Sequence, residues 1–87
     1  SAVELPFDYF DERAYQRPFT YQRALPWEEG FEGREVSLVF EAAMADATVW
    51  VNGQEVARHR DGYTPFEARL TPHLRRGDNR VTVRIAG

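Results

Sequence analysis

The sequence contains no cysteine and no lysine. Without cysteine the chain can form no disulfide, no thiolate nucleophile and no cysteine-ligated zinc site. Arginine supplies all 11 basic side chains, but 14 acidic residues leave a net charge of −3. Because this balance provides no basic field to attract a phosphate backbone, we expect no nucleic-acid partner.

Long apolar runs are also missing. No segment approaches the roughly 18 apolar residues that a membrane-spanning helix needs, and the N-terminus lacks the basic-then-apolar layout of a signal peptide. A G-x-S-x-G nucleophile elbow and a glycine-rich phosphate loop are absent as well. The sequence therefore predicts no membrane partner and no cofactor.

The 87 residues that are present have a globular composition, with 43% hydrophobic and 29% charged side chains. A chain of this length forms one small domain, so we predict a single β-sandwich domain over residues 1–87. Its first part, residues 1–17, mixes aromatic and acidic side chains without a sustained period, and Pro6 and Pro18 bracket it. This composition favours an irregular leader.

Period-two alternation dominates the rest of the chain and predicts short strands. The segments that read as strands are 19–25, 35–42, 47–51, 54–60, 63–70 and 80–86. In the first of them Phe19, Tyr21, Arg23 and Leu25 share one side, as in a half-buried strand. Strands of this length, separated by turn signals, are typical of an all-β protein with an antiparallel β-sandwich. Five or six strands are few for a complete sandwich, so we expect unpaired sheet edges.

Turn chemistry supports this interpretation. Asn52-Gly53 is the strongest hairpin signal, because both central residues of a type I′ turn need positive φ. Thr71, followed by Pro72, is expected to be the N-cap of a short helical turn. Trp50 stands in mid-strand between two valines, and its position favours packing in the core or at a sheet interface.

Candidates for catalysis are weak. Hydrolysis of a glycoside usually needs two carboxylates, one of which is kept protonated by its surroundings. Most of the acidic residues stand in predicted loops or on polar strand faces, where a solvated role is the simpler interpretation, so no catalytic residue is predicted. His59 and Asp61 form an H-x-D pair, but two ligands are too few to predict a metal site.

Several motifs in a fixed order carry a family resemblance. V-W-V-N-G at residues 49–53 is followed by G-Y-T-P-F at 62–66, a threonine-led turn, a G-x-N at 77–79 and a V-x-V strand. Over residues 21–85 the chain resembles the N-terminal sugar-binding domain of family 2 glycoside hydrolases, of the β-galactosidase or β-glucuronidase type. The resemblance implies a galactose-binding-like jelly roll.

In that family the domain lies beside a TIM barrel that carries both catalytic glutamates. The resemblance therefore implies a non-catalytic accessory domain of a larger multidomain glycosidase, with the catalytic TIM barrel as its partner and carbohydrate as a weak or indirect ligand. The family domain also has strands before Val3 and a further segment after Gly87, so three alternatives stay open for the sheet as given: it is complete, exchanged with a second copy, or ragged at one edge.

The resemblance also singles out the second turn. Asp61 aligns with an aspartate that reaches the glycone pocket in some β-galactosidases, so it is a candidate carbohydrate contact together with His59 and Tyr63. Trp27, in a loop after a proline, is a fourth candidate because an exposed indole can stack on a sugar ring. Alternatively, Asp61 and Gly62 are present only because these residue types favour a tight turn, and this structural interpretation stays open.

Two other functional classes are compatible with the sequence. A self-standing carbohydrate-binding module would bind sugar without a barrel. A protein-interaction module would use its unpaired strand edges to associate with a partner or a second copy.

Overall fold

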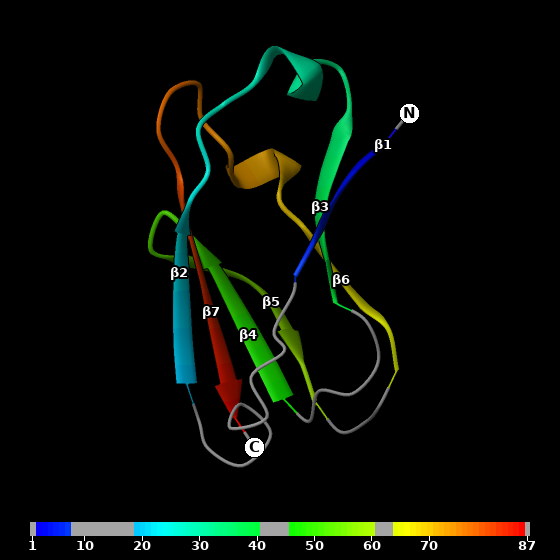
Figure 1. Cartoon of the computed structure of the whole chain (residues 1–87), viewed down its shortest axis with the longest axis vertical. Helices are drawn as coiled ribbons and strands as arrows, with labels where there is room; N and C mark the ends of the chain where they lie inside the picture. The colour runs from blue at the N-terminus through cyan, green and yellow to red at the C-terminus, as the bar shows by residue number, and fades with distance from the viewer. Residues whose placement is uncertain (1, 8–18, 41–45, 61–63, 87) are drawn as a thin grey trace.

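A computed structural model describes residues 2–7, 19–40, 46–60 and 64–86, which fold into strands and two short 3-10 helices (Figure 1). The strands are β1 (Ala2–Pro6), β2 (Phe19–Ala24), β3 (Glu35–Phe40), β4 (Asp46–Val51), β5 (Gln54–His59), β6 (Phe66–Arg69) and β7 (Arg80–Ala86). The helices are η2 (Glu29–Phe31) and η3 (Thr71–His73). In the described part of the chain no helix is long and apolar enough to cross a bilayer.

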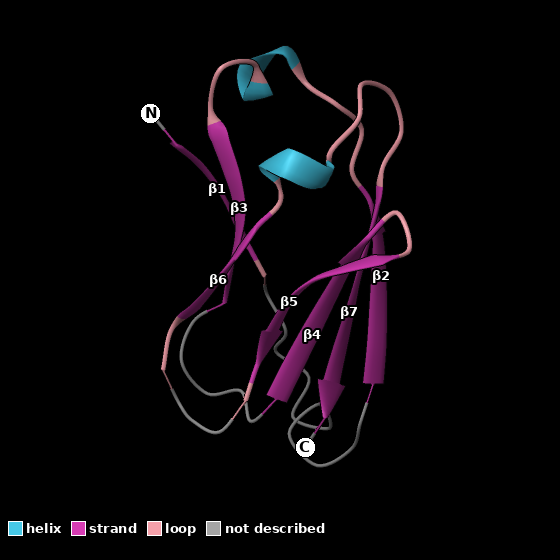
Figure 2. Cartoon of the chain, turned by 180° about the vertical axis from the view of Figure 1, so that it is seen from behind, coloured by secondary structure: helices cyan, strands magenta, loops and turns pink. Residues whose placement is uncertain are grey.

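The strands form two facing sheets, so the predicted all-β sandwich is confirmed (Figures 1 and 2). One sheet has the order β1-β3-β6 and the other the order β2-β7-β4-β5. Neighbouring strands are antiparallel, with one exception: β1 runs parallel to β3. The sheets approach each other at the β5 and β6 edges, where the two strands are in contact.

The expectation of an irregular leader over residues 1–17 was wrong for its first residues. Ala2–Pro6 is a strand, in which Val3 lies opposite Val36 and Leu5 opposite Leu38. The segment is only five residues long, and its pairing partner stands more than 30 positions away in the sequence. A local pattern of this length is too short to reveal a strand that depends on a distant neighbour.

The core lies between the sheets and is built from the apolar sides of the predicted strands. Alternation in β3, β4 and β7 points one set of side chains inward, as expected from the period-two pattern. The buried side chains of these three strands include Val36, Leu38, Phe40, Ala47, Val49, Val51, Val81, Val83 and Ile85. They form a single cluster with Ala68 and Leu70, so both sheets share one core.

The Asn52-Gly53 turn between β4 and β5 confirms the hairpin. Asn52 has φ 51° and Gly53 has φ 86°, the left-handed values that a type I′ turn requires. The side chain of Asn52 makes two further bonds: its Nδ2 donates to Oδ1 of Asn79, and its Oδ1 accepts from the backbone N–H of Arg80. The turn is therefore tied to the chain that enters β7.

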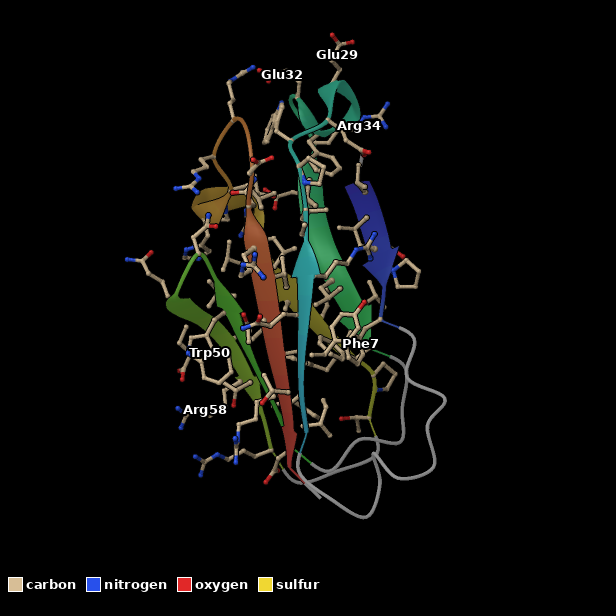
Figure 3. All side chains as sticks on the ribbon, turned by 60° about the vertical axis from the view of Figure 1, so that its left-hand side comes forward. Phe7, Glu29, Glu32, Arg34, Trp50 and Arg58 are labelled. Carbon is tan, nitrogen blue, oxygen red and sulfur yellow. The ribbon has the colours of Figure 1, made fainter. Side chains whose placement is uncertain are left out.

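Trp50 was predicted to pack in the core or at a sheet interface, and this was wrong. It alternates with the buried Val49 and Val51, so it lies half-buried on the outer face of the four-stranded sheet. Figure 3 shows its ring on the side of that sheet away from Phe7. A period of two assigns side chains to two faces, but which face a large aromatic side chain occupies depends on the register of its neighbours.

Thr71 also differs from its expected role. It is the first residue of η3 rather than its cap, and the N-cap residue Leu70 makes no side-chain capping bond. The Oγ1 of Thr71 instead accepts a 2.7 Å hydrogen bond from the backbone N–H of Val36, at the start of β3. The threonine therefore joins η3 to the three-stranded sheet.

β2 is less buried than its pattern predicted. Tyr21, Arg23 and Leu25 share one side, but Tyr21 is 39% exposed and Arg23 is exposed as well. β2 is an edge strand, and the opposite edge, β1, does not cover it closely. The sandwich is therefore open along this side.

Candidate functional site

The four predicted carbohydrate contacts do not form one site. His59 ends β5, in a row with Ala47 and Ile85, whereas Trp27 follows β2 beyond the opposite end of the same sheet. The two side chains therefore lie at opposite ends of the sandwich. Asp61 and Tyr63 lie outside the described residues, so their role stays a prediction.

His59 is held at its end of the sandwich by aromatic stacking. Its ring lies 4.9 Å from that of Phe66 at 15°, and Phe66 stacks in turn on the buried Phe40 at 5.2 Å. Its Nε2 atom is buried and has no hydrogen-bond partner among the described residues. His59 is therefore anchored to the core directly before the segment that contains Asp61 and Tyr63.

A surface hollow of about 290 Å³ lies beside His59. Its remaining lining residues are Asp46, Thr48, Arg58, Arg60 and Arg84. Three arginines against one aspartate give this hollow an excess of positive charge, although the chain as a whole is acidic. The hollow is thus better suited to an anionic than to a cationic ligand.

Trp27 has a packing role. Its ring meets Phe31 edge-on at 5.5 Å and 88°, and the guanidinium carbon of Arg76 lies 5.3 Å from its ring centre. Arg76 also forms an exposed 2.5 Å ion pair between its Nη2 and Oε2 of Glu32. One face of the indole is therefore already occupied by a cation, which leaves less of the ring for stacking on a sugar.

Glu35 forms a two-point ion pair with a neighbouring strand. Its two carboxylate oxygens accept hydrogen bonds of 2.6 and 2.7 Å from the Nε and Nη2 of Arg69 on the neighbouring strand β6. This hydrogen-bonded arginine holds the pKa of Glu35 below its usual value. A general acid for glycoside hydrolysis needs a raised pKa, so the environment of Glu35 is the opposite of what that role requires.

Metal-ligating side chains are not gathered in the described ranges. Within residues 2–7, 19–40, 46–60 and 64–86, no three histidine, aspartate or glutamate side chains come together as a potential metal site. His59 belongs to an aromatic stack, and its sequence neighbour Asp61 is outside these ranges.

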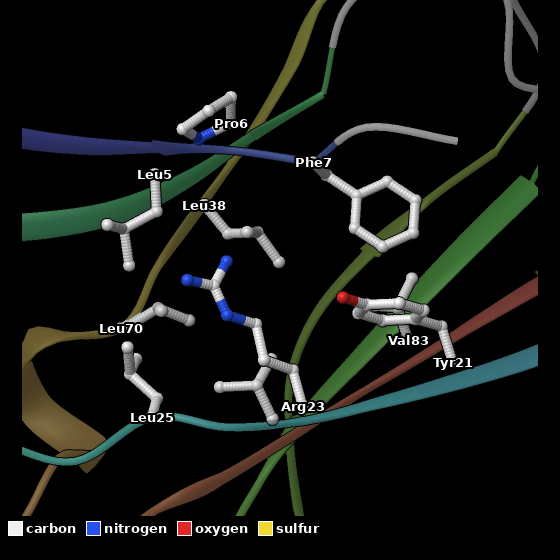
Figure 4. A pocket seen from close by; sticks show the side chains of 10 residues that line it. Leu5, Pro6, Phe7, Tyr21, Arg23, Leu25, Leu38, Leu70 and Val83 are labelled. Carbon is white, nitrogen blue, oxygen red and sulfur yellow. The ribbon is translucent and has the colours of Figure 1, made fainter. Parts of the chain in front are cut away.

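An apolar groove of about 270 Å³ follows the open side of the sandwich, between β1 and β2 (Figure 4). Leu5, Leu25, Leu38 and Leu70 line it, and the side chain of Arg23 extends among them. At one end, Phe7 and Tyr21 meet edge-to-face at 5.2 Å and 89°. No motif in the sequence marked this groove, because it arises where strands far apart in the sequence face each other, and no other strand of the described residues covers it.

The fold and its motifs match a known family. The family model for the glycosyl hydrolases family 2, sugar binding domain, matches residues 2–86. The chain belongs to this family. The resemblance expected from the motif order is therefore confirmed.

Members of the family include β-galactosidases and β-glucuronidases. The β-galactosidase of Rhizobium meliloti is 52% identical over 88 residues, which cover 100% of this chain and 11% of that protein. A β-glucuronidase of Paenibacillus borealis is 36% identical over 77 residues, which cover 87% of this chain and 12% of that protein. A β-glycosidase structure from Bacteroides vulgatus superimposes with a TM-score of 0.71 at 26% identity, covering 80% of this chain and 9% of that one. The chain thus spans about a tenth of the length of the relatives that it matches.

Proposed function

We propose that this chain is a non-catalytic accessory domain of a family 2 glycoside hydrolase of the β-galactosidase or β-glucuronidase type. One observation carries the proposal: the sugar-binding family model matches residues 2–86, and the same residues span only 11% of the R. meliloti β-galactosidase. In this proposal the catalytic glutamates belong to a TIM barrel in the rest of the enzyme. The properties of Glu35 are consistent with that division, since its carboxylate is kept ionised by Arg69.

The open side of the sandwich is the surface that we assign to packing against the rest of the enzyme. Its groove is lined by leucine side chains, of which Leu5 is partly exposed, and by the ring of Tyr21, which is 39% exposed. Burying such a surface is favourable by roughly 25 cal/mol per Å² of apolar area, so a covering segment would stabilise both parts. β1 and β2 border this side as sheet edges, which a further strand could extend.

The segment that follows β5 is the part that we assign to the substrate pocket. Its first end is fixed by His59, whose ring is stacked on Phe66 next to the core. Asp61 and Tyr63 follow directly in the sequence. A contact loop held by a rigid aromatic anchor could place a carboxylate near the hydroxyl groups of a sugar.

The first test is catalytic. The purified chain should not hydrolyse nitrophenyl β-galactoside or nitrophenyl β-glucuronide. Turnover by the pure chain that is abolished by a single Glu→Gln substitution would contradict a non-catalytic role.

The second test addresses the loop in the enzyme that carries this domain. Asp61→Asn should raise KM by about tenfold, since a hydrogen bond to a charged group contributes roughly 1.5 kcal/mol. Asp78→Asn removes the same charge from an exposed turn at the other end of the sheet and should leave KM unchanged. Equal KM values for the unmodified enzyme and the Asp61→Asn variant would show that Asp61 does not contribute to substrate binding.

A further inference from the structure

The outer face of the four-stranded sheet carries a row of charged and hydroxyl side chains that the accessory role does not use. In the strand register, Thr48 of β4 lies opposite Arg58 of β5 on one side and Arg84 of β7 on the other. Thr20 of β2 extends the row beyond Arg84. Strands are about 4.8 Å apart, so the backbones of the two arginines flank Thr48 at a separation of about 10 Å.

The positive charge of this row is only partly compensated. Arg58 forms an exposed ion pair with Glu55 at 2.6 Å, whereas Arg84 and Arg60 form no hydrogen bond or ion pair among the described residues. Exposed ion pairs contribute little energy, so Arg58 can exchange its partner at small cost. Together with Thr48, these arginines line the hollow beside His59.

An aromatic ring completes the surface. Trp50 is two residues along β4 from Thr48, on the same face, and lies opposite Thr82 of β7. It is half-buried, and Arg58 lies opposite Thr48, two residues from Trp50 along β4. An indole next to hydroxyl groups and guanidinium groups provides both a stacking surface and hydrogen-bond donors.

We propose that this face binds a saccharide that bears a carboxylate, at a site separate from the substrate pocket of the enzyme. The carboxylate would lie over Thr48, where Arg58 and Arg84 can donate to its oxygens, and the sugar ring would contact Trp50. Guanidinium groups match carboxylates in geometry as well as charge, which gives such a ligand an advantage over a neutral sugar. The hollow, at about 290 Å³, has the size of a site for a small ligand.

Other anionic partners fit this face less well. A nucleic acid needs an extended positive surface, and here Asp46 and Glu55 border the arginines in a chain of net charge −3. An acidic protein surface would pair with the arginines, but it would not account for a half-exposed indole beside threonine hydroxyl groups.

The test is a titration of the ¹⁵N-labelled chain followed by NMR. Methyl β-glucuronide should shift the backbone signals of Thr48 and Arg84 and the indole signal of Trp50, with a Kd on the order of 1 mM. Methyl β-glucoside and sodium acetate, which carry the ring alone and the carboxylate alone, should each bind at least about tenfold more weakly. Added salt should weaken the glucuronide complex, because exposed charges are screened.

Matched variants locate the site. Arg84→Gln should weaken glucuronide binding by about tenfold, and Trp50→Ala should weaken it by a similar factor. Arg34→Gln removes the same charge at the opposite end of the sandwich, in the turn after η2, and should have no effect. The spectrum of each variant reports whether it remains folded.

The other outcomes would overturn the proposal. Equal affinities for glucuronide and acetate would show that the hollow binds anions in general. Equal affinities for glucuronide and glucoside would show that the arginines do not contribute to binding. Absence of shifts on this face up to about 50 mM glucuronide would leave an acidic protein surface as the better partner. These results do not depend on the catalytic test, so failure here and failure of the accessory role are distinguishable.

Discussion

Asn79 is the buried polar residue that joins three parts of the chain. It is 3% exposed, and its Oδ1 accepts hydrogen bonds from the backbone N–H of Arg75 and from Nδ2 of Asn52. Its own Nδ2 donates to the carbonyl of Arg75. A single amide thus holds the turn before β7 and fastens it to the β4–β5 hairpin.

Replacing Asn79 should be costly for this reason. Asn79→Ala leaves the Arg75 N–H and carbonyl and the Asn52 amide without their partner, and we expect the free energy of unfolding to fall by about 2 kcal/mol. Urea denaturation measures the change. The neighbouring Asp78→Ala removes an exposed side chain and should change stability by less than about 0.5 kcal/mol. Equal effects of the two substitutions would contradict a special role for the amide.

The ion pair between Glu35 and Arg69 should make the stability of the fold depend on pH. Because the pKa of Glu35 is lowered in the folded chain, the pair stabilises the fold above the usual carboxyl pKa, and this stability is lost as the pH falls towards the lowered value. In Arg69→Gln the pKa of Glu35 should return towards its usual value, as followed by NMR of the ¹³C-labelled carboxyl group. An unchanged pKa in Arg69→Gln would show that the arginine is not its cause.

At the scale of elements, the β4–β5 hairpin is the feature that local sequence specifies most completely. Asn52 and Gly53 adopt the left-handed conformations that their residue types tolerate, and the two strands pair directly on either side. The neighbouring elements depend more on distant contacts. β1 is held by a parallel pairing with β3, and the start of η3 is fixed by the bond between Thr71 and Val36.

The hairpin turn can be tested with two glycines that differ in conformation. At Gly53, φ is +86° and no atom would clash with an added Cβ, so Gly53→Ala tests backbone strain alone. We expect it to lower the free energy of unfolding by about 1 kcal/mol. Gly30 has no atom within 4 Å of an added Cβ and no positive φ, so Gly30→Ala should be neutral within about 0.5 kcal/mol. Equal losses in both variants would argue against turn strain as the cause.

At the scale of the whole molecule, the two sheets depend on one another. Among the described residues neither sheet has a separate core, since Phe40, Val36 and Leu70 from one side pack in the same cluster as Val49 and Val83 from the other. A single shared core favours one cooperative unfolding transition.

The two tryptophans report on different parts of the molecule and can test this. Trp50 lies on the four-stranded sheet, and Trp27 packs beside η2 on the connection to β3. The variants Trp27→Phe and Trp50→Phe each keep one tryptophan. In each variant, the urea midpoint followed by tryptophan fluorescence should equal the urea midpoint followed by far-UV circular dichroism. A fluorescence midpoint that differs from the circular dichroism midpoint of the same variant would contradict a single cooperative transition.

The sequence by itself determined the features that depend on neighbours in the chain. Alternation placed Val49 and Val83 in the core, Asn52-Gly53 predicted the turn, and the motif order identified the family. These inferences succeed because strand period and turn chemistry act over a few residues, and motif order needs no structure at all.

Tertiary structure decided what depends on contacts between distant residues. It paired β1 with β3, placed Trp50 on the outer face, separated Trp27 from His59 by the length of the sheet, and formed the groove between β1 and β2. Each of these outcomes depends on which strands become neighbours and in which register. A local pattern contains no information about that choice, because the pairing energy comes from residues elsewhere in the chain.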